Sequence, residues 1–397
     1  MSRSVERQTI GYAWRGRRGT QFLPLAAALF VAAVLVRADA RVPPAQHAAT
    51  AQQRATMPRD ALDGYRHRLR VVVHGGSQAV SGDTTPTNTG TDYVVLLHLT
   101  GAQATAVFHG ATYGSGPPDN ATPFGDVTMW YTGGHTPRQI DVDADTATYG
   151  PWSARNVTLW FKLQAPLRAK PAADSHYVLA WGNHTPRVAR DWVRIYPLQA
   201  HVATGGIDPA TWNALGNVSV GGGILTVADT GNGQRNDMGI QSDRAFGVGY
   251  AVSARTQLPP VASGQYITVG WQDGLAPNGQ RYSATGAYFV AASAGDHSPT
   301  TWVADYYNGS TNSFTKIGPL DDAYRVYTVA RDGRGNPYYW RDAEAAVPIP
   351  NTASTSELNA VFHITNFTAA PFSAHLAWIK VRPWIAVEPY AGAVGRQ

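Results

Sequence analysis

The fold class is decided by the stretch Asn156-Val157-Thr158-Leu159-Trp160-Phe161-Lys162-Leu163. Val157, Leu159 and Phe161 recur at every second position, so a β-strand would present all three on one face. Comparable runs lie at 69–73, 93–99, 126–131, 175–181, 222–227, 249–254, 265–271, 287–292, 301–307, 324–330, 337–340, 360–365 and 374–381. Turn residues separate these runs, and helical periodicity is nearly absent after residue 70. The sequence therefore predicts an all-β protein made of two antiparallel β-sandwich domains.

The composition agrees with a globular chain that is rich in strands and turns. Its 397 residues exceed one ordinary domain, and its 40 Gly, 26 Pro, 12 Trp and 19 Tyr exclude a coiled coil and a mostly disordered chain. Cysteine is absent, which excludes disulfides, thiolate metal ligands and a cysteine nucleophile.

The formal net charge of +5 is concentrated near the N-terminus. Residues 1–70 carry 12 Arg and four acidic residues, a net charge of +8. The remaining 20 basic and 23 acidic residues carry a net charge of −3. The body of the chain therefore gives no reason to expect a nucleic-acid partner.

The N-terminal segment has the pattern of an export signal. Arg15, Arg17 and Arg18 precede the apolar run Phe22–Val36, and Ala38-Asp39-Ala40 follows it. This order predicts a secretory signal peptide, with a retained membrane anchor as the alternative. We expect an extracellular or cell-surface protein, which contacts a membrane only through residues 22–36 if the segment is uncleaved.

Composition and strand spacing divide the chain into five parts. Residues 1–40 form the signal or anchor, 41–64 a linker rich in Ala, Gln and Pro, 65–203 the first sandwich, 206–386 the second sandwich, and 387–397 a tail. Each predicted sandwich is long enough to bury a core of its own.

The first sandwich resembles an uncharacterised β-sandwich domain of secreted and envelope proteins. The resemblance rests on the order of Tyr65–Leu69, Gln139–Asp143, the Trp160 strand, and a closing Tyr177–Leu179 with Trp181-Gly182-Asn183. It implies an exported protein in which a second β-domain follows.

The second sandwich resembles a concanavalin A-like lectin/glucanase jelly roll. Asp208–Trp212 and Gly222–Val227 are similar to the opening of that family. Tyr324–Arg331 and Tyr338–Asp342 are similar to its paired late strands, and Trp378–Trp384 to its closing strand. The resemblance implies a jelly-roll fold and a carbohydrate partner.

The sequence gives little support for catalysis. Glycosidases on such a fold need two carboxylates, often as E-x-D-x-x-E on one strand. The chain has four glutamates, at Glu6, Glu344, Glu357 and Glu388, and none belongs to that pattern. No G-x-S-x-G elbow, paired-histidine motif or phosphate loop occurs. The sequence leaves the enzyme question open but favours a non-enzymatic protein.

Aromatic residues beside acids are the best candidates for sugar binding. We expect Trp271 and Asp273, at a strand end, to lie on the rim of a binding surface, together with Asp305 and Tyr307. The period of two places Asp305 and Tyr307 on one face of their strand. The same period places Trp302 and Tyr306 on the opposite face, which we expect to be core.

Three alternating acids form a candidate metal site. Asp141, Asp143 and Asp145 could face one way and hold a structural Ca²⁺, which takes oxygen ligands. The alternative is a solvated acidic strand edge, which would discourage aggregation. No other cofactor is expected.

The leading hypothesis is a secreted or surface-attached protein that binds glycan or envelope polysaccharide through its second sandwich. The first alternative is a self-assembling structural subunit of a surface layer, pilus or fibre. The second is a glycoside hydrolase. Fold by itself does not separate these three roles.

Overall fold

The computed structural model describes residues 62–82, 92–110, 126–183, 192–202, 207–274, 285–292, 301–307, 312–349 and 352–396. The predicted signal or anchor and all but the end of the predicted linker lie outside these residues. Regular structure is almost entirely β-strand, which confirms the all-β prediction. In the described part of the chain no helix is long and apolar enough to cross a membrane.

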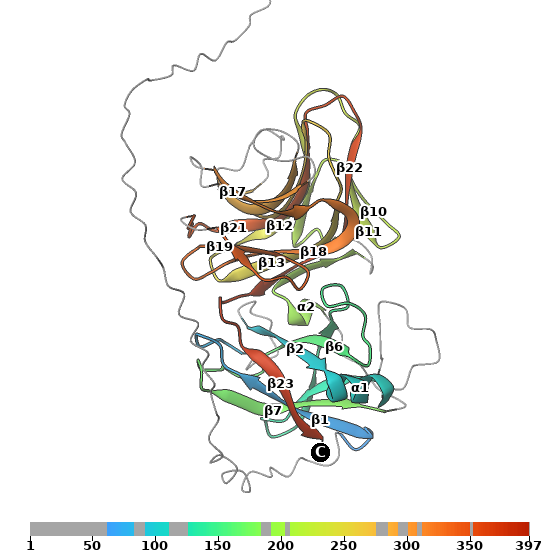
Figure 1. Ribbon diagram of the computed structural model, residues 1–397, viewed down its shortest axis with the longest axis vertical. Coiled ribbons are helices and arrows are strands. Elements are labelled where there is room, and N and C mark those ends of the chain that lie inside the picture. The colour runs from blue at the N-terminus through green and yellow to red at the C-terminus, as the bar shows by residue number, and fades with distance from the viewer. Residues whose placement is uncertain are drawn as a thin grey trace, which may run out of the picture. The chain divides into compact units, whose positions relative to one another are not determined.

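The first half of the chain builds most of one eight-stranded sheet, the N-terminal sheet (Figure 1). Its strands are β1 (His67–His74), β2 (Val94–Thr100), β3 (Thr128–Tyr131), β4 (Arg138–Ile140), β5 (Val142–Ala144), β6 (Asn156–Lys162), β7 (Ala173–Trp181) and β23 (Tyr390–Arg396), in the order β4-β3-β7-β1-β23-β2-β6-β5. Only Asp141 separates β4 and β5, yet they form opposite edges of the sheet. The sheet therefore curls until its edges meet, around a core that includes Ile140 and Val142.

The predicted tail is instead a central strand. Residues 390–396 form β23, which lies between β1 and β2 and is drawn in red among the blue and green strands of Figure 1. Ala391 of β23 belongs to the core of this sheet. The sequence hides this strand because its small residues, Tyr390-Ala-Gly-Ala-Val-Gly-Arg396, show no apolar alternation.

A ten-residue helix, α1 (Gly101–Gly110), was not expected from periodicity. Ala104 and Val107 are spaced by three residues and are fully buried against the core of the N-terminal sheet. The Thr105 hydroxyl lies 2.9 Å from the Gly101 carbonyl oxygen and 2.8 Å from that of Ala154, and it can donate its hydrogen to either. Most residues of the helix are small, so it has only a weak apolar stripe. It therefore depends on these contacts with the core and with Ala154. A second helix, α2 (Trp192–Ile195), is a single turn.

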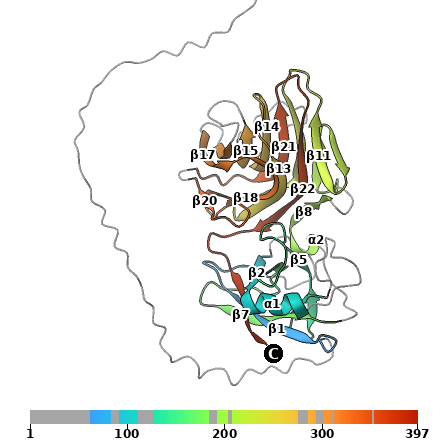
Figure 2. The same ribbon diagram turned by 45° about the vertical axis from the view of Figure 1, so that its right-hand side comes forward.

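The second half of the chain forms a two-sheet sandwich, and both sheets are visible in Figure 2. The eight-stranded sandwich sheet contains β10 (Val218–Gly221), β11 (Ile224–Asp229), β22 (Phe372–Pro383), β13 (Tyr250–Leu258), β18 (Asp321–Arg331), β19 (Pro337–Arg341) and β20 (Val347–Pro348), with β8 (Leu198–His201) paired to β22. The seven-stranded sheet contains β17 (Asn312–Pro319), β16 (Thr301–Tyr307), β15 (Gly286–Ala292), β14 (Gln265–Gln272), β21 (Leu358–Asn366), β12 (Asn236–Phe246) and β9 (Trp212–Leu215).

The chain passes back and forth between these two sheets. Strands β11 to β14 alternate between them, and so do β20 to β22. This antiparallel crossing pattern is that of a jelly roll, as the sequence predicted. Strand β8 precedes the predicted boundary at residues 203–206, but it pairs with β22 of the sandwich.

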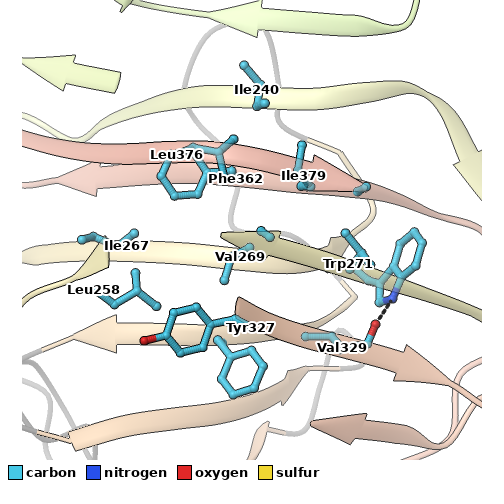
Figure 3. Packing of buried hydrophobic residues seen from close by; sticks show 14 of the residues in the cluster. Ile240, Leu258, Ile267, Val269, Trp271, Tyr327, Val329, Phe362, Leu376 and Ile379 are labelled. Carbon is cyan, nitrogen blue, oxygen red and sulfur yellow. Dashed lines mark hydrogen bonds between the residues drawn. The ribbon is translucent and has the colours of Figure 1, made fainter. Parts of the chain in front are cut away.

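The interior of the sandwich is filled by alternate residues of both sheets (Figure 3). Ile267, Val269 and Trp271 of β14 point inward, and the Trp271 indole N–H donates to the Val329 carbonyl at 2.9 Å. The Arg331 guanidinium lies 5.3 Å from the Trp271 ring and is fully buried. Its two terminal nitrogens donate to the carbonyls of Phe246, Gly247 and Ser356, so backbone oxygens stabilise this buried cation.

Candidate functional site

The residues between the inward-facing ones define a second surface, the outer face of the seven-stranded sheet. Register fixes one row across it, from Phe314 through Asp305, Tyr288, Gly270 and Val361 to Gln241. A neighbouring row runs from Val303 through Val290 and Thr268 to His363. Among the described residues, the strands of this sheet make their main contacts outside the sheet with the other sandwich sheet. Most residues of the outer face are buried, whereas Tyr288 and Gln241 are half-buried.

One side of this face is apolar and aromatic. Val290 and Val303 are buried at its floor, and Tyr266, Tyr288 and Phe314 pack around them half-buried. We call these five residues the aromatic patch. Flat aromatic rings can cover the C–H surface of a sugar ring.

Tyr288 is positioned by two glycines. A Cβ at Gly286 would lie 2.5 Å from Tyr288 Cε1, so the ring extends over that residue. A Cβ at Gly270, the residue opposite Tyr288 on β14, would lie 2.8 Å from Tyr288 Cβ. Gly270 also has a φ of +150°, a conformation that side chains rarely adopt. The two glycines thus leave the space in which the Tyr288 side chain lies along the sheet.

The other side of the face is polar but carries little charge. A Cβ at Gly274 would lie 3.7 Å from Gln241 Oε1 and 3.8 Å from Asn359 Oδ1, so the two amides converge there. The Asn359 Nδ2 donates to the Ser242 carbonyl at 2.7 Å, which fixes the orientation of that amide. Gln272 lies opposite Asn359, and its buried Oε1 has no hydrogen-bond partner among the described residues.

His363 lies beside these amides on β21. It is buried opposite Thr268, and neither ring nitrogen is hydrogen-bonded within the described part of the chain. Burial lowers the pKa of His363 to about 4, an effect to which nearby Arg235 adds and which Asp237 opposes. The imidazole is therefore neutral at pH 7 and can both donate and accept a hydrogen bond.

Asp305 and Asp237 are too far apart to act together as the two carboxylates of a glycoside hydrolase. Asp243 lies in the bulged part of β12, and the acids at paired strand positions of the face are Asp305 on β16 and Asp237 on β12. Four strand spacings separate them, or about 19 Å at about 4.8 Å per strand. Hydrolases hold their two carboxyl groups roughly 5 to 9.5 Å apart. Asp237 is also paired with Arg235 at 2.8 Å.

Trp271 was predicted to lie on the binding rim, and this prediction is wrong. Gly270 and Gln272 face outward, so the alternation of β14 turns Trp271 into the core, where it is fully buried. Figure 3 shows its indole directed toward Val329 among the inward side chains. Asp273 is exposed, one residue after the end of β14.

Asp305 and Tyr307 do share the outer face, as the period of two predicted. Asp305 is buried opposite Tyr288, whereas Tyr307 is half-buried opposite Gly286 at the end of β16. Trp302 and Tyr306 point inward and are buried, as expected. Whether Asp273, Asp305 or Tyr307 contacts a sugar stays a prediction.

The calcium hypothesis for Asp141, Asp143 and Asp145 must be corrected, because the three carboxylates serve different partners. Asp145 accepts from the Trp160 indole N–H at 2.8 Å, and Asp141 lies 3.9 Å from Arg194. Among the described residues, no group of three acids or histidines could hold a metal ion.

Asp143 belongs to a buried network with the eight-stranded sandwich sheet. Lys380 Nζ lies 3.0 Å from its carboxylate, and the Tyr196 hydroxyl donates to that carboxylate at 2.6 Å. Burial and the Asp143 charge raise the Tyr196 pKa well above its usual value, so the phenol stays protonated as a donor. This aspartate is therefore an ion-pair partner in the interior.

The sequence interpretation missed the aromatic patch and the amides. The alternation in Gly286-Ala-Tyr288-Phe-Val290 was visible, but it does not say which face is core. Gln241 and Asn359 lie 118 residues apart in sequence, and only the pairing of β12 with β21 brings them together. His363 belongs to no paired-histidine motif, so no sequence pattern marks it.

Comparison with known proteins adds only partial structural matches. No family model matches the chain. No curated protein matches its sequence. Similar solved structures include a glycoside hydrolase family 16 endo-glucanase from Bacteroides ovatus, with 14% identity, a TM-score of 0.35, and coverage of 46% of this chain and 99% of that one. The Bacillus licheniformis β-glucanase is 10% identical, with a TM-score of 0.36 and coverage of 47% and 97%.

An uncharacterised protein from Mycobacterium paratuberculosis is 16% identical, with a TM-score of 0.35 and coverage of 47% of this chain and 100% of that one. At these identities and TM-scores the similarity does not assign a function. The jelly-roll assignment rests on the strand order described above.

Proposed function

We propose that the protein binds an uncharged, hydroxyl-rich polysaccharide through the outer face of the seven-stranded sheet, without cleaving it. One observation carries the proposal: the aromatic patch and a group of neutral polar side chains lie next to one another on one sheet face. Sugars have the same two-sided chemistry, with C–H faces and hydroxyl edges.

The polar groups suit hydroxyls better than charged substituents. Gln241 and Asn359 amides both donate and accept, and so does the neutral imidazole of His363. A hydroxyl likewise donates and accepts, so each pair can be matched. We therefore place a sugar ring over Tyr288, with its hydroxyls directed toward Gln241 and Asn359.

The separation of Asp305 and Asp237 supports binding without cleavage. Their strands lie about 19 Å apart, roughly twice the longest separation that an inverting hydrolase uses. The proposal places the protein outside the cytoplasm, in contact with envelope or environmental glycans, because of the signal-like segment at residues 1–40.

The test is a binding survey with the full chain. Affinity electrophoresis would compare neutral polysaccharides, such as β-1,3-glucan, mixed-linkage glucan and xylan, with anionic pectin and alginate. Tyr288→Ala is expected to weaken binding of the preferred neutral glycan by about 1–3 kcal/mol, since it removes one stacking contact. Tyr324→Ala is the matched control, because Tyr324 is a half-buried tyrosine of β18 in the other sheet.

Equal loss of binding in both tyrosine variants, or no binding to any neutral glycan, would overturn the proposal. A reducing-sugar assay on the same samples addresses cleavage. Release of sugar ends that is abolished by Asp305→Asn or Asp237→Asn would replace the binding function with the hydrolase alternative.

A further inference from the structure

We propose that the slot between β1 and β2 of the N-terminal sheet is a strand-binding site, and that it can take residues 390–396 from a second copy of this chain. Within one chain, β23 fills this slot. Strand β1 pairs with β23 in antiparallel fashion from Leu69 to His74, and β2 pairs with it in parallel at Leu97. Strands β1 and β2 do not pair with each other, so the sheet is incomplete without this segment.

The occupant of the slot is held weakly for a central strand. Its inward residues are Ala391 and Ala393, which bury far less apolar surface than Val71 and Val73 on β1. Its outward residues Tyr390 and Val394 are 51% and 55% exposed. Only one register pair joins β23 to β2. Weakly packed elements open at lower free energy than the rest of a fold.

The slot nevertheless selects this particular segment. The Gln103 side-chain amide donates to the Ala393 carbonyl at 2.9 Å. The Tyr390 ring stacks on His74 at 4.8 Å, and Lys170 lies 5.6 Å from the same ring. Departure of β23 would leave two unpaired strand edges above a buried apolar floor, a surface that recruits another strand. A matching strand of a second copy satisfies all of these contacts.

The connection before β23 is anchored at its sandwich end. Arg382 donates to both carboxylate oxygens of Glu388, at 2.9 and 3.0 Å, and Trp384 is buried against Ala251 and Ala330. The sandwich can therefore stay folded while residues 390–396 move. Exchange of identical strands between copies produces closed dimers or open chains, depending on geometry.

Cysteine substitution tests the exchange in the full chain, because the natural sequence contains no cysteine. Val72 lies directly opposite Gly392, and a Cβ at Gly392 would meet no atom within 4 Å. Val72→Cys protein would be mixed with Gly392→Cys protein, concentrated, oxidised mildly, and examined by mass spectrometry for the mixed disulfide dimer. Val72→Cys mixed with Val220→Cys is the matched control, because Val220 is exposed on β10 of the sandwich.

We expect the Val72–Gly392 mixed dimer to exceed the control by at least roughly tenfold, and to increase with protein concentration. The double variant Val72→Cys/Gly392→Cys, oxidised when dilute, should form an internal disulfide and remain monomeric at concentrations where the wild type associates. A mixed dimer no more abundant than the control overturns strand exchange. Failure of the internal disulfide to form would overturn the slot itself. Neither outcome depends on glycan binding.

Discussion

The two outer faces of the sandwich use polar residues in opposite ways. On the eight-stranded sandwich sheet, Lys380 and Arg382 are buried and paired with Asp143 and Glu388. On the seven-stranded sheet, the corresponding surface carries amides, a neutral imidazole and the aromatic patch. The first face is joined to the N-terminal sheet by the Lys380–Asp143 ion pair, whereas the second carries polar groups that, in our proposal, suit an uncharged ligand.

The contrast is between polar groups that hold the fold together and polar groups that we propose bind a ligand. A buried charge must be paired within the protein, since leaving it alone costs several kcal/mol. A neutral amide costs less to desolvate than a charge, and its donor and acceptor atoms match those of a sugar hydroxyl. We therefore expect substitutions on the first face to change stability alone, and substitutions on the second to change binding first.

The largest effect is expected from Trp271→Ala, because Trp271 lies in the core between the two sheets of the sandwich. The change removes a fully buried indole and its hydrogen bond to Val329, and should lower the free energy of unfolding by about 5 kcal/mol. Urea denaturation measures it, with Tyr288→Ala as the control from the outer face of the same sheet, expected to lose much less. A small loss of stability in Trp271→Ala would indicate that the Trp271 side chain lies at the surface. That result would contradict the assignment of the two faces.

Lys380→Ala should destabilise the protein by about 3 kcal/mol, because it leaves the Asp143 carboxylate buried without its cation. Replacing both partners, as Lys380→Met with Asp143→Leu, should recover much of this loss. Chemical denaturation compares the single and double variants, and affinity electrophoresis should find glycan binding unchanged in both. If either variant weakened glycan binding as much as Tyr288→Ala does, the two faces would not be functionally distinct.

A smaller effect on stability is expected when the pH is lowered, because His363 resists protonation in the folded protein. The folded-state pKa of about 4 lies below the ordinary value of 6.5, so the unfolded chain takes up the proton first as pH falls. Stability from this group is complete above pH 6.5 and is lost progressively between about pH 6.5 and 4. The free energy of unfolding should fall by about 2 kcal/mol between pH 7 and pH 5 on its account. Denaturation of wild type and His363→Gln at both pH values measures the difference, and identical pH profiles would contradict the neutral, buried imidazole.

Local alternation was enough to predict the strands and some of the faces. Asp305 and Tyr307 were correctly separated from Trp302 and Tyr306 because a strand has a period of two. The same rule could have placed Trp271 in the core, since Ile267 and Val269 share its parity. The Gly-Trp-Gln-Asp-Gly context misled the interpretation, because it marks the end of a strand and not the direction of a side chain.

The pairing of strands that are distant in sequence could not be predicted from local sequence patterns. Strand β23 joins β1 across more than 300 residues, and its Ala and Gly residues give no apolar signal. Asp143 meets Lys380 across 237 residues, so its charge looked like a metal ligand when only its neighbours in sequence were known. The glycan-binding proposal likewise depends on Gln241 and Asn359, which only sheet register brings together.

The most direct test of the central claim is a crystal structure of the protein with an oligosaccharide of the neutral polysaccharide that binds best. We predict a sugar ring stacked on Tyr288, with hydroxyls within hydrogen-bond distance of Gln241 and Asn359. An intact oligosaccharide in this position would support binding through the outer face of the seven-stranded sheet. A sugar bound instead near Lys380 and Arg382, or elsewhere away from Tyr288, would contradict the account.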